Sequence, residues 1–415
     1  MAISCDPVNT EPPVFLEQNK TVLVYIAGNN NLTRYAETNL KGIVNGYVPD
    51  NDNLLVYFHT NNCNPSLLKV YKNKKGEVSV DTVYKFPVWN SATTEAVVGA
   101  MKVTKTMFPA KEYGLFLWSH GTGWLPSGYF SEGRMPKDDE ENGGSENKVR
   151  SLSGRGNVRV TSNANEIWNT STPWKEYPNG VDPAAHLVKS FGSEGDKEME
   201  ITDLAKSLPY KLSFLVFDAC LMGDIEVAYE LKDSVDYVVC SPAEILANGF
   251  PYQNIMQHVY KTPTDLVGVA KEYYEFYKNS SNPSATISVV KTSELVGVAL
   301  EAKVIFNKYR SKIGQLDVSN IQRYFRYNKH WFYDVGDFIT QLSSPAEAAP
   351  FIKSLNNAVI YKAATPDFLY DYGGFTIDPN KYSGLGIYIP TEPSDPELNE
   401  FYKKFKWNMD ANLIQ

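Results

Sequence analysis

The amino-acid sequence predicts an α/β fold, a three-layer sandwich in which helices cover both faces of a mostly parallel sheet. Two observations lead to this prediction. Six short segments are continuous apolar runs without polar alternation, which is typical of strands that are buried on both faces. Helical patterns such as 93–108 and 264–279 separate several of these runs, and such alternation of strand and helix is typical of an α/β fold.

The predicted strands are taken in chain order. Each is a short run rich in β-branched, aromatic and aliphatic residues, and the first ends in the polar turn "GNNNL". Their ranges are 20–28, 52–60, 113–121, 212–220, 235–241 and 285–292. The helical pattern "LMGDIEVAYELKD" follows Cys220 directly.

Two regions depart from this alternation. Residues from about 125 to 200 are rich in Gly, Ser, Asn and charge, and such a composition buries too little apolar surface to order itself. We therefore expect a long, exposed insertion that proteases cut readily. After residue 296 the chain is helical and aromatic, and it closes with the strand-like "YGGFTIDP" and "GLGIYIP". The expected organisation is a tail at 1–20, a core at 21–295 that carries the insertion, and a helical C-terminal subdomain at 296–415 with closing strands.

Composition restricts the partners and the location. The 415 residues carry 48 acidic and 40 basic side chains, a net charge of -8, which argues against nucleic acid or an anionic membrane as the main partner. No apolar run reaches 18 residues, so no transmembrane segment is expected. A signal-peptide apolar region is also lacking, but "AISCDPVNTEPP" resembles the start of a trimmed bacterial lipoprotein with a lipid anchor at Cys5. The alternative is a floppy tail with an incidental cysteine.

Chemically capable residues follow two of the predicted strands. His120 ends the run at 113–121, and Cys220 ends the run at 212–220. Reactive groups collect beyond the carboxyl ends of strands in open parallel sheets. If these two strands are neighbours, we expect His120 and Cys220 to face each other at one rim.

A cysteine and a histidine in this arrangement suit thiol nucleophilic catalysis. The thiolate is the attacking species, and an imidazole stabilises it or relays protons to the leaving amine. The helix predicted directly after Cys220 would favour the thiolate further. The N–H groups of Gly121 and Cys220 could form an oxyanion hole. The alternative is that Cys220 is a small buried hydrophobe.

The other cysteines and histidines lack such a setting. We interpret Cys63 and Cys240 as structural residues. The remaining histidines, His59, His186, His258 and His330, are scattered, and the cysteine spacing shows no metal pattern. The acidic run "KDDEEN" lacks the order of a calcium loop, so we interpret it as a solvated stretch. No cofactor is required by this reading.

The motifs "HGTGW" and "DACLMG", each after an apolar strand, resemble those of the clostripain family of cysteine peptidases. The opening "TVLVYIAGNNNL" and the closing "GLGIYIP" resemble the same family, so the resemblance spans about residues 20–390. It implies a caspase-like fold, with His120 as general acid/base, Cys220 as nucleophile, and Gly121 and Cys220 as oxyanion donors. It also places Asp218 and Ser241 beside the pocket for the residue that precedes the cut bond. The alternative for Asp218 is a cap on the following helix.

The chain departs from the family pattern in its acids and its spacing. Family members of known preference cut after Arg or Lys, and a second pocket acid is expected after the strand at 235–241. Only Glu244 is available between Asp236 and Asp265, so a basic preference is left open. His120 and Cys220 are 100 residues apart, and the resemblance implies a self-cleavage site between them. The exposed candidates are Arg134, Lys137, Lys148, Arg150, Arg155 and Arg159.

The leading hypothesis is a bacterial cysteine endopeptidase that acts on protein or peptide substrates. We expect it to be made as a zymogen and to be secreted or anchored on the cell envelope. Some relatives use calcium, but no ligand motif here supports it. The alternatives are a catalytically silent caspase-like module that binds at the cell surface, and a cysteine acyltransferase on the same scaffold. The sequence gives no indication of the oligomeric state.

Overall fold

A nine-stranded mixed sheet forms the centre of the protein in the computed structural model, which describes residues 17–129, 199–326, 329, 331–391 and 395–415. Its strand order is β10-β8-β7-β6-β5-β1-β2-β3-β4. In that order the strands are Val359–Ala364, Thr286–Lys291, Val235–Cys240, Leu212–Asp218, Ala110–Trp118, Gln18–Gly28, Asn53–Thr60, Cys63–Lys72 and Val78–Lys85. Most of the insertion predicted at about 125–200, and the tail with Cys5, lie outside the described residues.

The middle of the sheet is parallel and both edges are antiparallel. β7, β6, β5, β1 and β2 run in the same direction. β8 on one side and β3 on the other run in the opposite direction, and the edge strands β10 and β4, each antiparallel to its neighbour, return to the direction of the central strands. All six predicted strands are present. The direction of β8 was not predicted, and neither were the β3–β4 hairpin and β10. The burial of β4 explains one omission, because most of its side chains are exposed or half-buried and form no apolar run.

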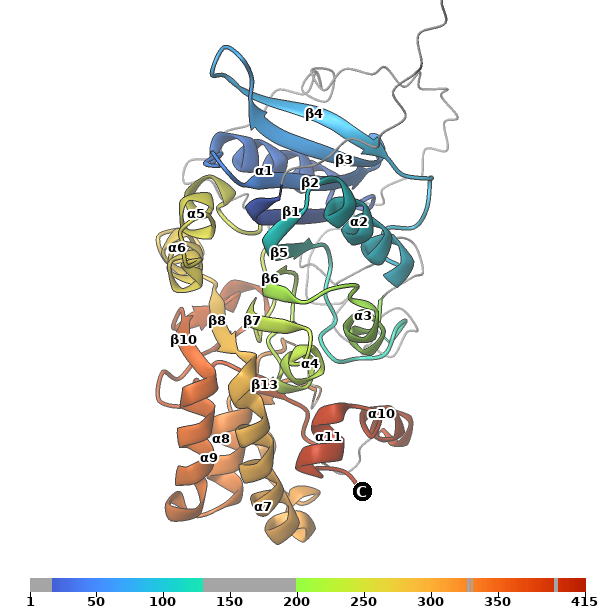
Figure 1. The fold of residues 1–415 in the computed structure, drawn as a ribbon. Helices are drawn as coiled ribbons and strands as arrows, with labels where there is room; N and C mark the ends of the chain where they lie inside the picture. The colour runs from blue at the N-terminus through green and yellow to red at the C-terminus, as the bar shows by residue number, and fades with distance from the viewer. Residues whose placement is uncertain (1–16, 130–198, 327–328, 330, 392–394) are drawn as a thin grey trace, which may run out of the picture.

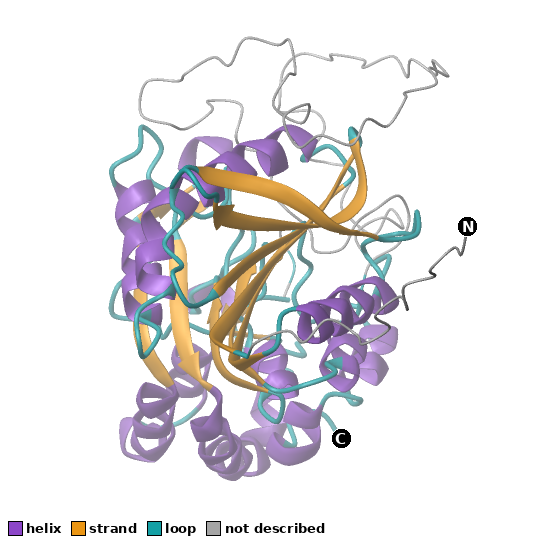
Figure 2. Ribbon diagram, turned by 45° about the horizontal axis from the view of Figure 1, so that its top comes forward, coloured by secondary structure: helices purple, strands orange, loops and turns teal. Residues whose placement is uncertain are grey.

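Six helices form the two outer layers (Figures 1 and 2). Figure 1 shows α1, α5 and α6 on one face of the sheet and α2, α3 and α4 on the other. Two of these helices begin at caps that the sequence encodes: Thr93 accepts from Ala96 N–H ahead of α2, and Asp265 accepts from Gly268 N–H ahead of α6. Their ranges from α1 to α6 are Thr33–Asn45, Thr94–Met107, Ile201–Ser207, Ile225–Leu231, Tyr252–Val259 and Leu266–Lys278.

The C-terminal part is mainly helical and packs on the edge of the core that carries β8 and β10 (Figure 1). Helix α9 contacts β8 and β10, and α11 contacts α4. The helices α7 to α11 are Leu295–Ile313, Val335–Leu342, Pro345–Ala358, Pro396–Tyr402 and Lys406–Ala411. Two small sheets accompany them, formed by β9 (Tyr333–Asp334) with β13 (Gly386–Ile387) and by β11 (Asp367–Phe368) with β12 (Phe375–Thr376).

The hydrophobic core runs along both faces of the central strands. Val22 to Ile26 of β1 and Leu115 to Trp118 of β5 are almost completely buried, as expected for strands with a helical layer on each side. Within the described ranges, no helix has both the length and the apolar character needed to cross a membrane. The central sheet therefore provides a rigid support for the loops at its carboxyl edge.

Candidate active site

The carboxyl ends of β5 and β6 lie side by side. The two strands pair in parallel, and Trp118 is opposite Asp218 in the register. His120 and Cys220 each follow two residues later, so they leave the sheet at the same rim. His120 is 8% exposed and Cys220 is 2% exposed.

Gly121 of the His120 loop lies close to the backbone of Cys220. A Cβ atom at this position would lie 2.3 Å from the carbonyl oxygen of Cys220 and 2.9 Å from its nitrogen. Any other residue would clash with backbone there, which explains why glycine follows the histidine. The backbones of the His120 loop and the Cys220 loop are therefore in direct contact.

Asn31 is a further polar partner at this rim, and the sequence reasoning missed it. Its Oδ1 lies 2.8 Å from Nε2 of His120. An amide oxygen only accepts, so this contact assigns a proton to Nε2. Asn31 lies in the "GNNNL" turn after β1, the strand next to β5. The sequence feature that could have pointed to Asn31 is therefore this polar turn, which lies at the carboxyl end of a strand next to β5.

The sulfur of Cys220 lies against the backbone of Ile245. The Ile245 N–H donates to Sγ at 3.1 Å, and the thiol contacts the Ile245 carbonyl oxygen at 3.4 Å. Directly after Cys220 the chain turns sharply, because Leu221 adopts a left-handed conformation with φ of 59°. The Leu221 N–H then donates to Ala243 O at 2.9 Å. The segment 243–245, which follows β7, is thus attached to the cysteine loop.

The expected helix N-terminus at Cys220 is not present. Helix α4 begins at Ile225, and residues 221–224 form a turn before it. The helix dipole acts only within the first turn, so it does not explain any activation of this thiol. The sequence pattern predicted the helix correctly but placed its start too early.

Asp218 and Ser241 are both completely buried. Asp218 Oδ2 accepts from the Phe250 N–H at 3.2 Å and from the Tyr252 hydroxyl at 3.1 Å. Ser241 Oγ donates to Ala243 O at 2.9 Å and lies 2.6 Å from Thr286 Oγ1. The alternative that Asp218 caps the following helix is wrong, since the residue at that position of α4 is Asp224.

The remaining described cysteines are free thiols whose burial disfavours the thiolate. Burial strongly raises the pKa of Cys240, which is inaccessible to solvent. Burial also raises the pKa of Cys63, although nearby Lys85 opposes the shift. Both findings agree with the structural role expected of these two residues.

Two buried carboxyl groups lie close to the loops that follow β5 and β6. Asp224 is enclosed between Gly123 of the His120 loop and Gly386, where added Cβ atoms would approach its carboxylate oxygens to 2.6 and 2.1 Å. Glu226 Oε1 accepts from the Tyr388 N–H at 3.0 Å and from the Tyr402 hydroxyl at 2.5 Å. Burial raises the pKa of both acids, and each disfavours ionisation of the other.

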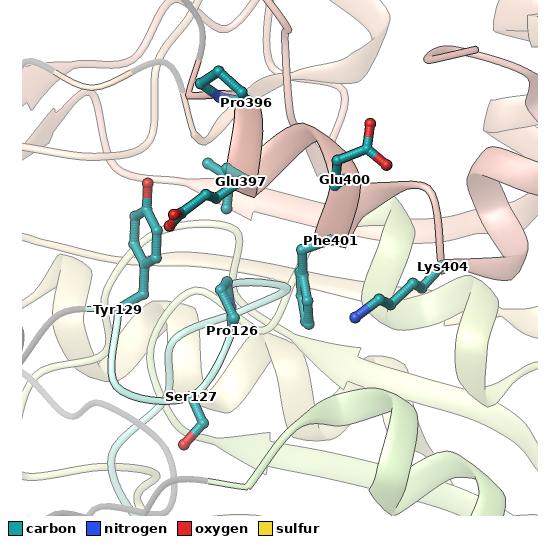
Figure 3. A pocket seen from close by; sticks show the side chains of 9 residues that line it. Pro126, Ser127, Tyr129, Pro396, Glu397, Glu400, Phe401 and Lys404 are labelled. Atoms are coloured by element: carbon teal, nitrogen blue, oxygen red, sulfur yellow. The ribbon is translucent and has the colours of Figure 1, made fainter.

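A groove of about 560 Å³ lies near the His120 loop, between residues 126–129 and helix α10 (Figure 3). Figure 3 shows the rings of Tyr129 and Phe401 beside it, with Lys404 at one end. Neither His120 nor Cys220 is among its lining residues in the described part of the chain. The described ranges also contain no group of three His, Cys, Asp or Glu side chains that could hold a metal ion.

Comparison with known proteins identifies the family of this chain. The model of the clostripain family matches residues 24–154 and 166–413. An inactive zymogen C11 protease from Parabacteroides distasonis is 33% identical, with a TM-score of 0.74 and coverage of 96% of this chain and 99% of that one. A secreted C11 cysteine protease from Bacteroides thetaiotaomicron, in complex with an irreversible peptide inhibitor, is 25% identical, with a TM-score of 0.71 and coverage of 95% and 99%. No curated protein matches the sequence.

The caspase-like α/β fold and these similarities define the class of protein: it is a cysteine peptidase. The family match covers most of its length. The chain belongs to the clostripain family.

Proposed function

We propose that the protein is an endopeptidase in which Cys220 is the nucleophile and His120 the general acid/base. The observation that carries this proposal is the contact of Gly121 with the backbone of Cys220, because it brings the ends of β5 and β6 together. The Cys220 thiolate attacks the peptide carbonyl carbon, and a C–S bond forms. The oxyanion is stabilised by the N–H groups of Gly121 and Cys220.

The second half of the reaction needs the same histidine. His120 gives its proton to the departing amine as the C–N bond breaks, which leaves a thioester on Cys220. Water then attacks the thioester carbon while His120 takes a proton from it, the C–S bond breaks, and the carboxylic acid product leaves as the Cys220 thiolate is restored. The hydrogen bond from Nε2 to Asn31 supports this role, since it fixes the ring orientation and tautomer.

Peptide hydrolysis and thiol labelling test the assignment. Cys220→Ala and His120→Ala should each lower the cleavage of a fluorogenic peptide at least about 1,000-fold, while Cys63→Ala should retain it. In the parent protein, mass spectrometry should find iodoacetamide on Cys220 well before Cys63 or Cys240. Equal labelling of the three cysteines, or full activity of Cys220→Ala, would reject the assignment.

For substrate preference we infer cleavage after Arg or Lys, with Asp218 as the pocket acid and Ser241 in the pocket wall. The support is the position of Asp218 at the end of β6, two residues before Cys220, together with the resemblance that places it beside this pocket. Glu244 is a poor second acid, because Arg326 already binds its carboxylate. A peptide panel that varies only the residue before the cut bond tests this inference.

A zymogen that is cut between His120 and Cys220 completes the proposal. The P. distasonis relative was solved as an inactive zymogen, and the basic candidates from Arg134 to Arg159 lie outside the described residues. Purified protein should split into two fragments as activity appears, and N-terminal sequencing should identify one of these sites. A fully active intact chain would exclude this part of the proposal.

We also propose that the peptidase acts outside the cytoplasm, on protein or peptide substrates. The support is the B. thetaiotaomicron relative, which is described as secreted and binds a peptide inhibitor. A lipid anchor at Cys5 is testable separately: Cys5→Ser should release the protein from the envelope fraction, and an unchanged distribution would reject the anchor.

A further inference from the structure

The backbone of Ile245 is the closest polar neighbour of the Cys220 sulfur among the contacts described above. Its N–H points at Sγ from 3.1 Å, and its carbonyl oxygen lies 3.4 Å away. An N–H donor favours the charged form of the group that accepts from it. The dipole of α4 does not reach Cys220, whereas this amide donates directly to the sulfur and so stabilises a thiolate there.

The position of Ile245 depends on the residue before it. Glu244 is 3% exposed, and its carboxylate binds the guanidinium of Arg326 in a two-point ion pair. Arg326 Nε donates to Oε2 at 2.7 Å, and Nη2 donates to Oε1 at 3.1 Å. This geometry is the strong, orientation-specific form of an arginine–carboxylate contact. A rigid link of this kind fixes the adjacent peptide group as well.

Arg326 is itself firmly held. Its Nη1 donates to the Tyr372 carbonyl oxygen at 3.2 Å, so the guanidinium is anchored on a third side. Arg326 lies in the segment 321–326, which pairs with the segment 331–334. The Tyr324 N–H donates to Phe332 O at 2.9 Å, and the Asp334 N–H donates to Gln322 O at 2.8 Å.

The paired segments 321–326 and 331–334 also contact the loop that carries His120. The indole N–H of Trp124 donates to Trp331 O at 3.0 Å. Trp124 lies four residues after His120 in the same loop. The segments 321–326 and 331–334 therefore connect the His120 loop with residues 243–245, which contact the Cys220 sulfur.

We propose that Glu244 and Arg326 are positioning residues, whose ion pair holds the Ile245 amide against Sγ and thereby makes Cys220 reactive near neutral pH. The proposal rests on Cys220 as the nucleophile. It assigns to the C-terminal extension a part in the chemistry, although no residue of the pair touches the reacting atoms. Without the pair, the 243–245 segment keeps the Leu221–Ala243 hydrogen bond but loses its attachment on the other side.

The test measures the pH dependence of Cys220 alkylation in the full chain, with mass spectrometry to follow that cysteine alone. Breaking only one partner would leave a buried unpaired charge, so the main variant is Glu244→Gln combined with Arg326→Met. We expect the midpoint of the alkylation profile to move up by about 1 pH unit, which means about 10-fold slower labelling below the midpoint, because a hydrogen bond to a charged group is lost. Arg326→Lys keeps the charge but not the two-point geometry, and its midpoint should lie between the two.

A matched control comes from Arg310, which is also anchored on backbone carbonyls, those of Leu413 and Asn412. Arg310→Met should leave the midpoint unchanged. In peptide hydrolysis, the double variant should lower kcat about 10-fold with little change in KM.

An unchanged or lower midpoint, or faster labelling of the double variant, would overturn the proposal, since the segment would then shield the sulfur rather than activate it. A Cys220 that is not alkylated in either the parent protein or the double variant would also contradict the proposal. If the double variant shows the expected midpoint shift relative to the parent protein, but the parent hydrolyses no peptide, this inference stands and the proposed endopeptidase is rejected instead.

Discussion

Nε2 of His120 lies 2.8 Å from Oδ1 of Asn31, a residue almost 90 positions earlier in the chain. The contact links the turn after β1 to the loop after β5, two strands that are neighbours in the sheet. It resembles the orienting partner of the histidine in other nucleophile–base pairs, where a third group fixes the ring.

Replacing Asn31 should change the pH profile of catalysis. Asn31→Ala removes the orienting acceptor, and we expect kcat/KM to fall about 10-fold. Asn31→Asp restores an acceptor and adds a negative charge near the imidazole, which should raise the pKa of His120 by about 1 unit. The profile of kcat/KM against pH measures both effects. Identical profiles for the parent and Asn31→Asp would show that the contact does not act on His120.

Gly121→Ala should abolish activity. The new Cβ would lie 2.3 Å from Cys220 O, so the two loops must separate and the oxyanion donors move apart. We expect a loss of at least about 100-fold in kcat and a destabilisation of about 1–3 kcal/mol.

Gly297→Ala is the matched control for this substitution. Gly297 lies in α7, where the nearest atom to a Cβ is Ser354 Oγ at 3.9 Å. Alanine there should leave kcat unchanged and stabilise the helix by up to about 1 kcal/mol. Chemical denaturation and peptide hydrolysis of both variants check the pair, and a fully active Gly121→Ala would contradict the proposed contact.

Asp218→Asn separates charge from shape. The amide oxygen can still accept from the Phe250 N–H and the Tyr252 hydroxyl, which now bind Oδ2, but the negative charge is lost. We expect kcat/KM for peptides cut after Arg to fall at least about 10-fold, while a peptide with an uncharged residue at that position is cut as before. A uniform loss for both peptides would assign Asp218 to folding rather than to substrate preference.

Stability should fall as pH rises, because of Asp224 and Glu226. Burial raises the pKa of both above the values near 4 that unfolded acids have. The folded protein therefore binds more protons than the unfolded chain once the pH exceeds about 4, and stability declines through the raised folded-state values. The slope should be about 1.4 kcal/mol per pH unit for each proton involved.

The double variant Asp224→Asn, Glu226→Gln should flatten this dependence between pH 5 and 8 in urea unfolding. Glu400→Gln is its control, because Glu400 is an exposed acid on α10 that pairs with Lys403. An equal slope in the parent and the double variant would show that other groups carry the pH dependence.

The sequence alone was sufficient to predict the central strands and to place both catalytic candidates at the ends of two of them. Strands buried on both faces give continuous apolar runs, and the end of such a run marks the functional rim. The β3–β4 hairpin lies at the edge of the sheet, where β4 is mostly exposed, so no such run exists. The helix after Cys220 was placed too early because the left-handed position of the intervening turn is occupied by Leu221 rather than by a glycine.

The partners of the site residues were harder to predict. Asn31 contacts His120, Ile245 contacts Cys220, and Arg326 contacts Glu244 beside Ile245, and the partners in these contacts are 25 to 89 residues apart in sequence. Local patterns carry no information about such pairs. The polar turn at Asn31 was visible, but only the order of strands in the sheet shows that it meets His120.

The ladder between β5 and β6 has a consequence for any break in the connection that joins them. Such a break divides the chain into an amino-terminal piece with β1 to β5 and a carboxyl-terminal piece with β6 onward. The two pieces remain paired through β5 and β6 in the middle of one sheet, with Leu115 beside Leu215 and Trp118 beside Asp218. Separating them would unpair two strands that are buried in the middle of the sheet, so a nicked protein should migrate in solution as a single particle.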